Sequence, residues 1–422
     1  MASIWRFLKT YLFQSGAAIA FVAPIFVNFV ISWRFGVSEA TGWVLSLAWA
    51  SWLRLTFSSK FIDLGNRFAG LSKDKNAEQI VISRSLLLEF GFTLIQLTGV
   101  FIAYQAVEQI GPQQAILMLT VVLGQSLRDQ ALFLLRLKKG TKNAFSVAWV
   151  DGCIRLLLLT PLIAATEITG LLVALPFIGL APLYIGYIGY TLITHFRTDT
   201  HRLWQHIDGY KAFFFIQHMN TFLRIGYQNI DVIIVPLILS GEPLWLYVTL
   251  RQLVVNASAL SVGPKAHATI PNLVRRFSSE PSNFSKWLAR IRWQFLGFSA
   301  LTISLGCGVF VVWAQIVDAD LAMLAVIGSY LITVGLLRSN MWWNKDLMFF
   351  WHPFTSSAQS IIASALSLSA AAIAVNIGQL GVFLICHAGA FAFIALSSEV
   401  ILRLRLLRAM PNAKTANIKT PT

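Results

Sequence analysis

Five arginines lie inside long apolar stretches of this sequence: Arg54, Arg128, Arg155, Arg224 and Arg251. A charged side chain at the centre of a membrane-spanning helix costs roughly 2.5–3.5 kcal/mol, so five of them call for a partner or a function. A guanidinium is planar, stays charged and offers paired donors that match a phosphate or a carboxylate. The five arginines therefore predict a binding site for an anionic headgroup.

Acidic side chains share these stretches and are candidates for binding a coupling ion, H⁺ or Na⁺: Asp231, Glu89, Asp151 and Asp129. Asp151 and Arg155 are four residues apart, so they either neutralise each other on one helix or contact substrate. Part of the charge of Arg128 can be neutralised by Asp129 or Glu89. Asp231 is either an ion site or a partner for another helix.

Arg224, Arg251 and Arg54 have no acidic residue three or four positions away on the same helix. They are therefore the first candidates for contacting substrate. Around Arg224, polar residues recur at helical spacing and form a stripe that cannot face lipid: Gln217, Asn220, Thr221, Gln228 and Asp231. Other candidates for lining a cavity are Gln125, Asn256 and Asn28. Pro236 permits a bend near the outer end of the same helix.

The amino-acid composition indicates which kind of secondary structure carries these residues. Of 422 residues, 56% are hydrophobic and only 12% are charged. This excludes a soluble enzyme and predicts an all-α, polytopic membrane protein with about twelve spans. The predicted spans are 11–34, 41–62, 82–106, 113–136, 144–166, 170–195, 211–239, 243–265, 292–316, 321–343, 355–376 and 379–402. The cysteines lie singly in apolar runs, and no metal site or cofactor is predicted.

The net charge of +15 is distributed unevenly between the connections. All but six of the 33 Lys and Arg residues fall in alternate connections and at the two ends, whereas the other connections are short and acidic. The positive-inside rule makes the basic side cytoplasmic, with both termini inside. The basic excess is thus a signal of orientation and of contact with membrane lipids, and nucleic acid is not an expected partner.

The longest basic connections follow the second and the eighth predicted spans, which suggests an internal six-plus-six repeat. We therefore predict an N-terminal lobe over residues 1–205, a C-terminal lobe over 206–404 and a cytoplasmic tail over 405–422. The outer connections are too short to form a catalytic domain. This weighs against an enzyme, namely a membrane-embedded glycan polymerase or transferase.

Three further stretches of the sequence are informative: Ser58–Arg67, Leu127–Leu132 with the basic turn at Lys138, and Gln228–Val235 followed by Leu246–Arg251. They resemble the Wzx-type polysaccharide flippases of the multidrug/oligosaccharidyl-lipid/polysaccharide (MOP) exporter superfamily. The resemblance implies two six-helix lobes of MATE-like fold around a central cavity that opens alternately to either membrane face. Related lipid II flippases use arginines in helices 1, 2 and 8. Arg54 and Arg251 match the last two by location, but helix 1 has only Arg34 at its outer end.

The resemblance also implies the cargo, a polyprenyl-pyrophosphate-linked oligosaccharide for surface polysaccharide biosynthesis in the bacterial inner membrane. Expected partners are this lipid-linked substrate, membrane lipids, and a glycan polymerase or other assembly proteins. A pyrophosphate with sugars cannot cross hydrocarbon unaided, and the buried arginines would replace its water. The alternative is an ion-coupled, MATE-like exporter of drugs or small solutes. A binding site for a cationic drug, however, is expected to contain more acidic residues than arginines.

Overall fold

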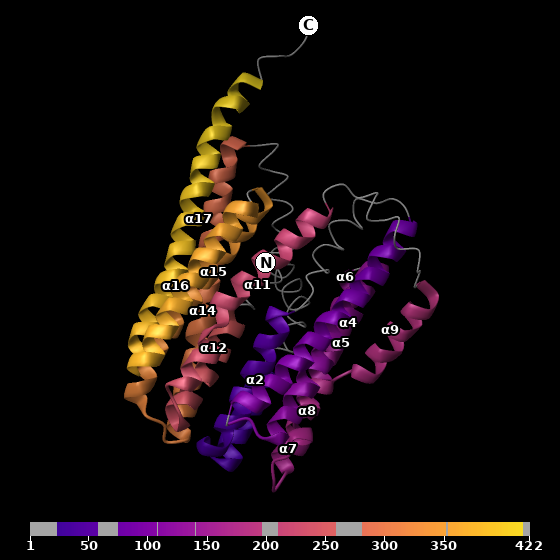
Figure 1. The fold of residues 1–422 in the computed structure, drawn as a ribbon, viewed down its shortest axis with the longest axis vertical. Helices are drawn as coiled ribbons and strands as arrows, with labels where there is room; N and C mark the ends of the chain where they lie inside the picture. Colours follow the sequence, from indigo (N-terminus) through magenta and orange to yellow (C-terminus); the bar gives the residue numbers. More distant parts are fainter. Residues whose placement is uncertain are drawn as a thin grey trace, which may run out of the picture. The chain divides into compact units, whose positions relative to one another are not determined.

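The computed structural model describes residues 23–57, 75–107, 109–139, 141–195, 210–258, 281–351 and 353–416 (Figure 1). Within these ranges the elements are helices, and none is a β-strand. They form two compact units. Unit 1 contains the described residues of Met1–Ile225 and Ser240–Thr249, and unit 2 those of Gly226–Leu239 and Leu250–Thr422. The predicted lobe boundary at residue 205 lies outside the described residues and stays a prediction.

Unit 1 is built from helices that follow one another closely along the chain. They are the helix Ala23–Phe35, α2 (Val37–Thr56), α4 (Lys75–Ala106), α5 (Pro112–Lys139), α6 (Thr141–Leu157), α7 (Thr160–Ala164), α8 (Gly170–Ile178), α9 (Ala181–His195) and the first part of α11 (Tyr210–Asn229). Helix α5 packs against α2, α4, α6, α8 and α9 and is therefore the centre of this unit. Gly124 lets α5 approach α8 closely, because a Cβ there would lie 2.7 Å from the carbonyl oxygen of Phe177.

Unit 2 is dominated by four long helices that lie side by side (Figure 1). They are α14 (Pro281–Ile316), α15 (Leu321–Trp351), α16 (Pro353–Ile377) and α17 (Leu380–Ala416). The unit also contains α12 (Asp231–Ile234), the 3₁₀ turn η2 (Val235–Leu237) and the second part of a helix at residues 241–258. The division between units falls inside α11, after Ile225, and inside the helix 241–258, after Thr249.

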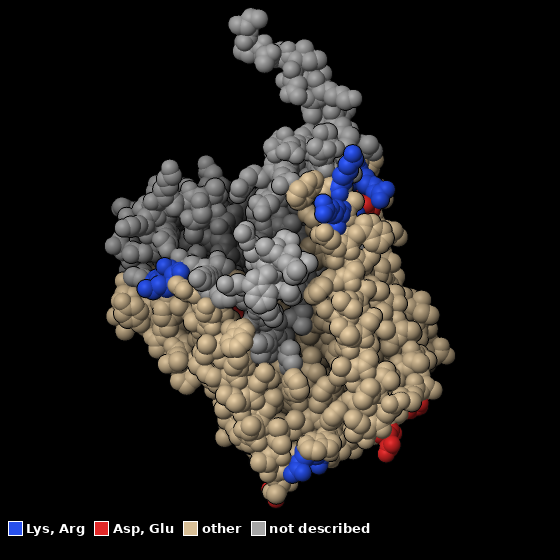
Figure 2. All heavy atoms as spheres, turned by 180° about the vertical axis from the view of Figure 1, so that it is seen from behind, with Lys and Arg blue, Asp and Glu red and all other residues tan. Residues whose placement is uncertain are grey.

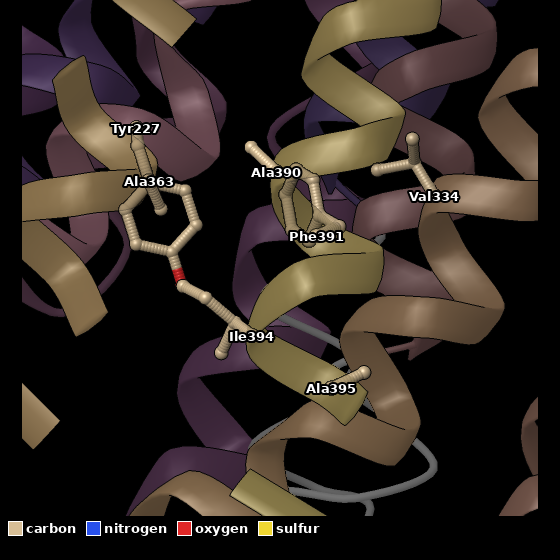
Figure 3. Packing of buried hydrophobic residues seen from close by; sticks show 7 residues of the cluster. All are labelled: Tyr227, Val334, Ala363, Ala390, Phe391, Ile394 and Ala395. Atoms are coloured by element: carbon tan, nitrogen blue, oxygen red, sulfur yellow. The ribbon is translucent and has the colours of Figure 1, made fainter. Parts of the chain in front are cut away.

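Each unit has its own apolar core. In unit 1, Leu86, Phe133, Leu134 and Ile188 are buried together with Tyr184. In unit 2, residues from four helices interlock around Tyr227 and Phe391, whose rings meet edge to face (Figure 3). The other members of this cluster are small or branched: Val334, Ala363, Ala390, Ile394 and Ala395. Small residues at these positions let the helices approach closely, as is usual in membrane proteins.

The prediction of an all-α, multi-pass membrane protein is confirmed. Among the described residues, six helices are long and apolar enough to cross a membrane, or seven if the bent pair α8–α9 forms one span. The helices α2, α5 and α11 and residues 241–258 are not among them. These are the helices that carry Arg54, Arg128, Arg224 and Arg251. Four of the five arginines therefore lie on helices outside this set, and Arg155 lies on α6, which belongs to it.

Two predicted spans are interrupted, which corrects the sequence-based prediction. The span 170–195 divides into α8 and α9, bent by 55°. The span 211–239 divides into α11, α12 and η2, with Pro236 inside the 3₁₀ turn. Several helices are also longer than predicted: α14 begins at Pro281, and α17 continues to Ala416, into the predicted tail. Loop cations such as Arg67 and Arg197 lie outside the described residues.

Several charges of unit 2 lie toward the ends of its long helices. Figure 2 shows an uncharged surface between blue side chains at one end of α14–α17 and red ones at the other. Asp318 and Asp320 lie in the turn between α14 and α15, whereas Arg290 and Arg292 lie near the start of α14 and Arg403 near the end of α17. This is the pattern expected of helices that cross a bilayer.

Candidate functional site

Arg54 on α2 joins two side chains of α5. Its Nη1 donates to Oε1 of Gln125, and its Nη2 donates to Oδ2 of Asp129. Gln125 and Asp129 are one helical turn apart, so the forked guanidinium spans both. The side chains of Arg54 and Asp129 remain 17% and 29% exposed. Sequence spacing alone could not reveal this pair, because the acid lies on a different helix.

Asp151 on α6 is completely buried and accepts hydrogen bonds from two arginines. Nε of Arg128 lies 2.9 Å and Nε of Arg155 lies 2.8 Å from its Oδ2. Nη1 of Arg128 is also 3.5 Å from Oδ1 of Asp129. The chain of charges therefore runs Arg54, Asp129, Arg128, Asp151 and Arg155, and we call it the unit 1 charge network. It holds one more cation than anion.

The break between α8 and α9 belongs to this network. Gly179 ends α8 with φ of 51°, a conformation that glycine adopts readily. The backbone amide of Leu180 then donates to Oδ1 of Asp151 at 2.8 Å. Because this amide directly precedes α9, the carboxylate caps the positive end of that helix. The helix over the predicted span 170–195 is broken at this point, and a carboxylate from α6 accepts a hydrogen bond from the backbone that the break exposes.

The unit 1 charge network is not fully satisfied within the described residues. Nη2 of Arg128 and Nη2 of Arg155 are buried and have no hydrogen-bond partner there. Leaving a buried donor without a partner costs about 1–3 kcal/mol, and more for a charged group. The network is therefore costly for the fold, which is common at functional sites.

In unit 2, Arg251 forms a fork with the segment that follows α11. Its Nε donates to Oδ2 of Asp231, and its Nη2 lies 2.9 Å from Oδ1 of the same carboxylate. The same Nη2 donates to Oδ1 of Asn229 at 3.0 Å. Arg251 is 8% exposed and Asp231 is 3% exposed. Of the two roles that the sequence left open for Asp231, the structure shows the interhelical partner, and the ion site stays a prediction.

His387 on α17 also lies at the break after α11, and in the sequence it is only a lone histidine in an apolar run. Its Nε2 lies 2.6 Å from the carbonyl oxygen of Tyr227, and its Nδ1 lies 2.6 Å from the hydroxyl of Tyr330. The ring stacks on Phe383 and is 1% exposed. With both ring nitrogens engaged, His387 ties α15 and α17 to the end of α11.

The remaining predicted residues lie as follows. Arg224 is half-buried on α11, and Asn220, Thr221 and Gln228 of the same polar stripe are buried. Asn28 is buried, and Asn256 and Glu89 are half-buried. The side chain of Gln217 lies outside the described residues. Arg54 and Arg224 are thus the two least buried of the five arginines, and both belong to unit 1.

No protein-family model matches this sequence, and no curated protein matches it either. Solved structures of similar fold are MATE transporters. A crystal structure of MATE in complex with MaD5 superposes with a TM-score of 0.56 at 14% identity, covering 96% of this chain and 97% of that one. A multidrug resistance MATE family transporter of the MOP superfamily matches at 13% identity in an inward-facing conformation (TM-score 0.53) and in an outward-facing one (0.54). Each match covers 96% of this chain and at least 95% of the other. At this identity the likeness shows a shared fold.

Proposed function

We propose that this protein is a transporter, not an enzyme, that flips a polyprenyl-pyrophosphate-linked oligosaccharide across the bacterial inner membrane. It would move the cargo from the cytoplasmic to the outer face by alternating access, with both termini in the cytoplasm and a glycan polymerase or other assembly proteins as partners. The fold shared with MATE transporters supports transport. The arginines support the cargo.

The observation that carries the proposal is the excess of positive charge in the unit 1 charge network. Three arginines face two aspartates there, and buried guanidinium donors lack partners within the described residues. An anionic pyrophosphate would compensate this charge, whereas a cationic drug would add to it. The network is therefore better suited to an anionic cargo.

Exposure divides the five predicted arginines into two groups. Arg54 and Arg224 are only half-buried, so in this proposal they contact the headgroup first. Arg128, Arg155 and Arg251 are buried in ion pairs, and they can bind substrate only if those pairs open. Among the acids, Asp129 pairs with Arg54 and is part-exposed, so in this proposal it exchanges the coupling ion when the cargo binds.

The test is translocation of a lipid-linked oligosaccharide in reconstituted vesicles. The sugar carries a fluorescent label, and a membrane-impermeant quencher reports which leaflet it occupies. Arg54→Gln should slow translocation by roughly ten- to a hundred-fold, because it removes one charge-assisted hydrogen bond to the headgroup. Arg34→Gln, which removes an exposed cation outside the site, should leave the rate unchanged. Normal translocation by folded Arg54→Gln and Arg224→Gln variants would contradict the proposal.

The alternative, an ion-coupled exporter of drugs or small solutes, is favoured by the multidrug MATE transporters among the solved structures of similar fold. The same vesicles distinguish the two functions when they are loaded with a cationic dye. A flippase should move the lipid-linked sugar and leave the dye, whereas an exporter should do the reverse.

A further inference from the structure

The first turns of α14 carry exposed basic and aromatic side chains on one face. Lys286, Arg290 and Trp293 are spaced at i, i+4 and i+7, so they lie above one another along the helix. All three are exposed, Trp293 by 73%. Within the described residues neither Lys286 nor Arg290 takes part in an ion pair. Two neighbouring cations are therefore available to a ligand at the surface.

The nearby acid is already occupied by other arginines. Glu399 on α17 pairs with Arg292 and accepts from Nε of Arg403 at 2.7 Å. Its carboxylate therefore has two cations of its own. The blue side chains that Figure 2 shows at this end of α14–α17 thus represent a net positive charge beside an uncharged surface.

Below Trp293, the same face of α14 continues as an apolar strip. Gly297 is exposed, and a Cβ at this position would meet no atom within 4 Å, so the strip is notched there. Leu301 and Leu305 follow and are 55% and 62% exposed. They belong to the candidate membrane span Lys286–Ile316. Over about five turns, this face of α14 therefore presents first two cations, then the indole of Trp293, then the gap at Gly297 and finally two leucines.

We propose that this face binds one anionic phospholipid, and we call it the α14 lipid face: Lys286, Arg290, Trp293, Gly297, Leu301 and Leu305. The two cations bind the phosphate, Trp293 lies at the level of the ester groups, and an acyl chain runs along the notch and the leucines. A nucleic acid or an acidic protein would use the cations but would leave the aliphatic strip uncovered. The bound lipid is distinct from the transported cargo, so this inference does not depend on the proposed function.

The experiment measures lipid retention on the purified full-length protein. Native mass spectrometry counts the lipids bound when phosphatidylglycerol or phosphatidylcholine is added to the detergent at equal concentrations. We expect preferential binding of phosphatidylglycerol. Each of Lys286→Gln and Arg290→Gln should weaken it roughly five-fold, and the double variant more, while phosphatidylcholine binding stays the same.

Two further variants separate the headgroup from the chain. Gly297→Leu fills the notch and should reduce binding of both lipids, because it acts on the acyl chain. Arg34→Gln is the matched control, since Arg34 is also an exposed cation beside a tryptophan, 5.9 Å from the Trp33 ring, but lacks the second cation. This variant should bind both lipids as the unaltered protein does.

Three results would overturn the inference. They are equal binding of the two lipids by the unaltered protein, undiminished phosphatidylglycerol binding by the double variant, and displacement of the lipid by inorganic phosphate at constant ionic strength. The last result would mean that the ligand is a free anion. Elution volume and thermal midpoint confirm that each variant is folded before its lipids are counted.

Discussion

At the scale of single residues, the described ion pairs of the buried arginines mostly reach another helix. Arg54 reaches Asp129, Arg128 reaches Asp151 and Arg251 reaches Asp231. Arg155 pairs with Asp151 on its own helix, and Arg128 also contacts its neighbour Asp129. A buried pair gains little net stability, because desolvation of both charges offsets their attraction, but removal of one partner is expensive. These pairs therefore act mainly by fixing which helix faces meet.

The pair Arg251–Asp231 allows a direct separation of structural and substrate roles. Arg251→Gln and Asp231→Asn should each lower the free energy of unfolding by about 3–5 kcal/mol, since each leaves one charge buried alone. The double variant should lose clearly less than the sum of the two. Unfolding in mixed detergent micelles measures the stability of each variant, and vesicle transport is measured on the same samples.

The control is Arg403→Gln, which breaks an exposed pair and should cost less than about 1 kcal/mol. If Arg251 also binds cargo, the double variant regains stability but not transport. Strictly additive losses of stability would show that the pair is not coupled.

At the scale of helices, the two interrupted spans have one feature in common. Polar side chains from other helices form hydrogen bonds at each break. Asp151 accepts from the Leu180 amide between α8 and α9. His387 and Arg251 bind the residues on either side of Ile230, which separates α11 from α12. In a membrane, backbone groups released by a break must find partners inside the protein. A tertiary contact satisfies the backbone at the first break, and tertiary contacts flank the second.

Gly179→Ala tests the first of these breaks. A Cβ at residue 179 would overlap Oδ1 of Asp151 and lie 2.8 Å from Nε of Arg155, at a positive φ that disfavours alanine. We expect the free energy of unfolding to fall by roughly 2–5 kcal/mol. Gly186→Ala, in the exposed interior of α9 with no atom within 4 Å, should be neutral or stabilising by at most about 1 kcal/mol. Equal stability of the two variants would mean that the network tolerates movement of α9.

At the scale of the whole molecule, the charges at the helix ends predict how the chain is oriented in the bilayer. The 28 residues of α5 span about 42 Å, more than the roughly 30 Å of hydrocarbon. The amide of Gly170 donates to Gln113 near the start of α5, so the loop containing Glu167 lies at that end of the helix. Lys139 is the last residue of α5. The two residues should therefore be on opposite sides of the membrane.

Cysteine labelling tests this orientation in a variant that lacks Cys153, Cys307 and Cys386. A cysteine in place of Glu167 should react with a membrane-impermeant maleimide in intact cells. A cysteine in place of Lys139 should react only after permeabilisation, because the basic side is predicted to be cytoplasmic. The reverse pattern would invert the topology, and with it the proposed direction of transport.

The sequence by itself determined that this is a helical, multi-pass membrane protein and which of its charges lie within apolar segments. Composition suffices for the first, because hydrocarbon admits few polar residues. Spacing along one helix sufficed for Asp151 and Arg155, which are neighbours at i and i+4. The ends of helices such as α14 and α17 were less predictable, because long basic segments can continue a helix beyond the apolar run.

Only the tertiary structure decided which arginines are paired, which are exposed and where two spans break. The partners of Arg54 and Arg251 come from other helices, and the rotation of each helix about its axis cannot be read from its own sequence. The break at Gly179 needs a carboxylate that lies 28 residues earlier in the chain. By spacing along the sequence, Arg251 is a first candidate for contacting substrate, but in the structure it is buried in its pair with Asp231. Arg54, although it pairs with Asp129, and Arg224 are less buried, so the proposed function gives them the first contact with the cargo.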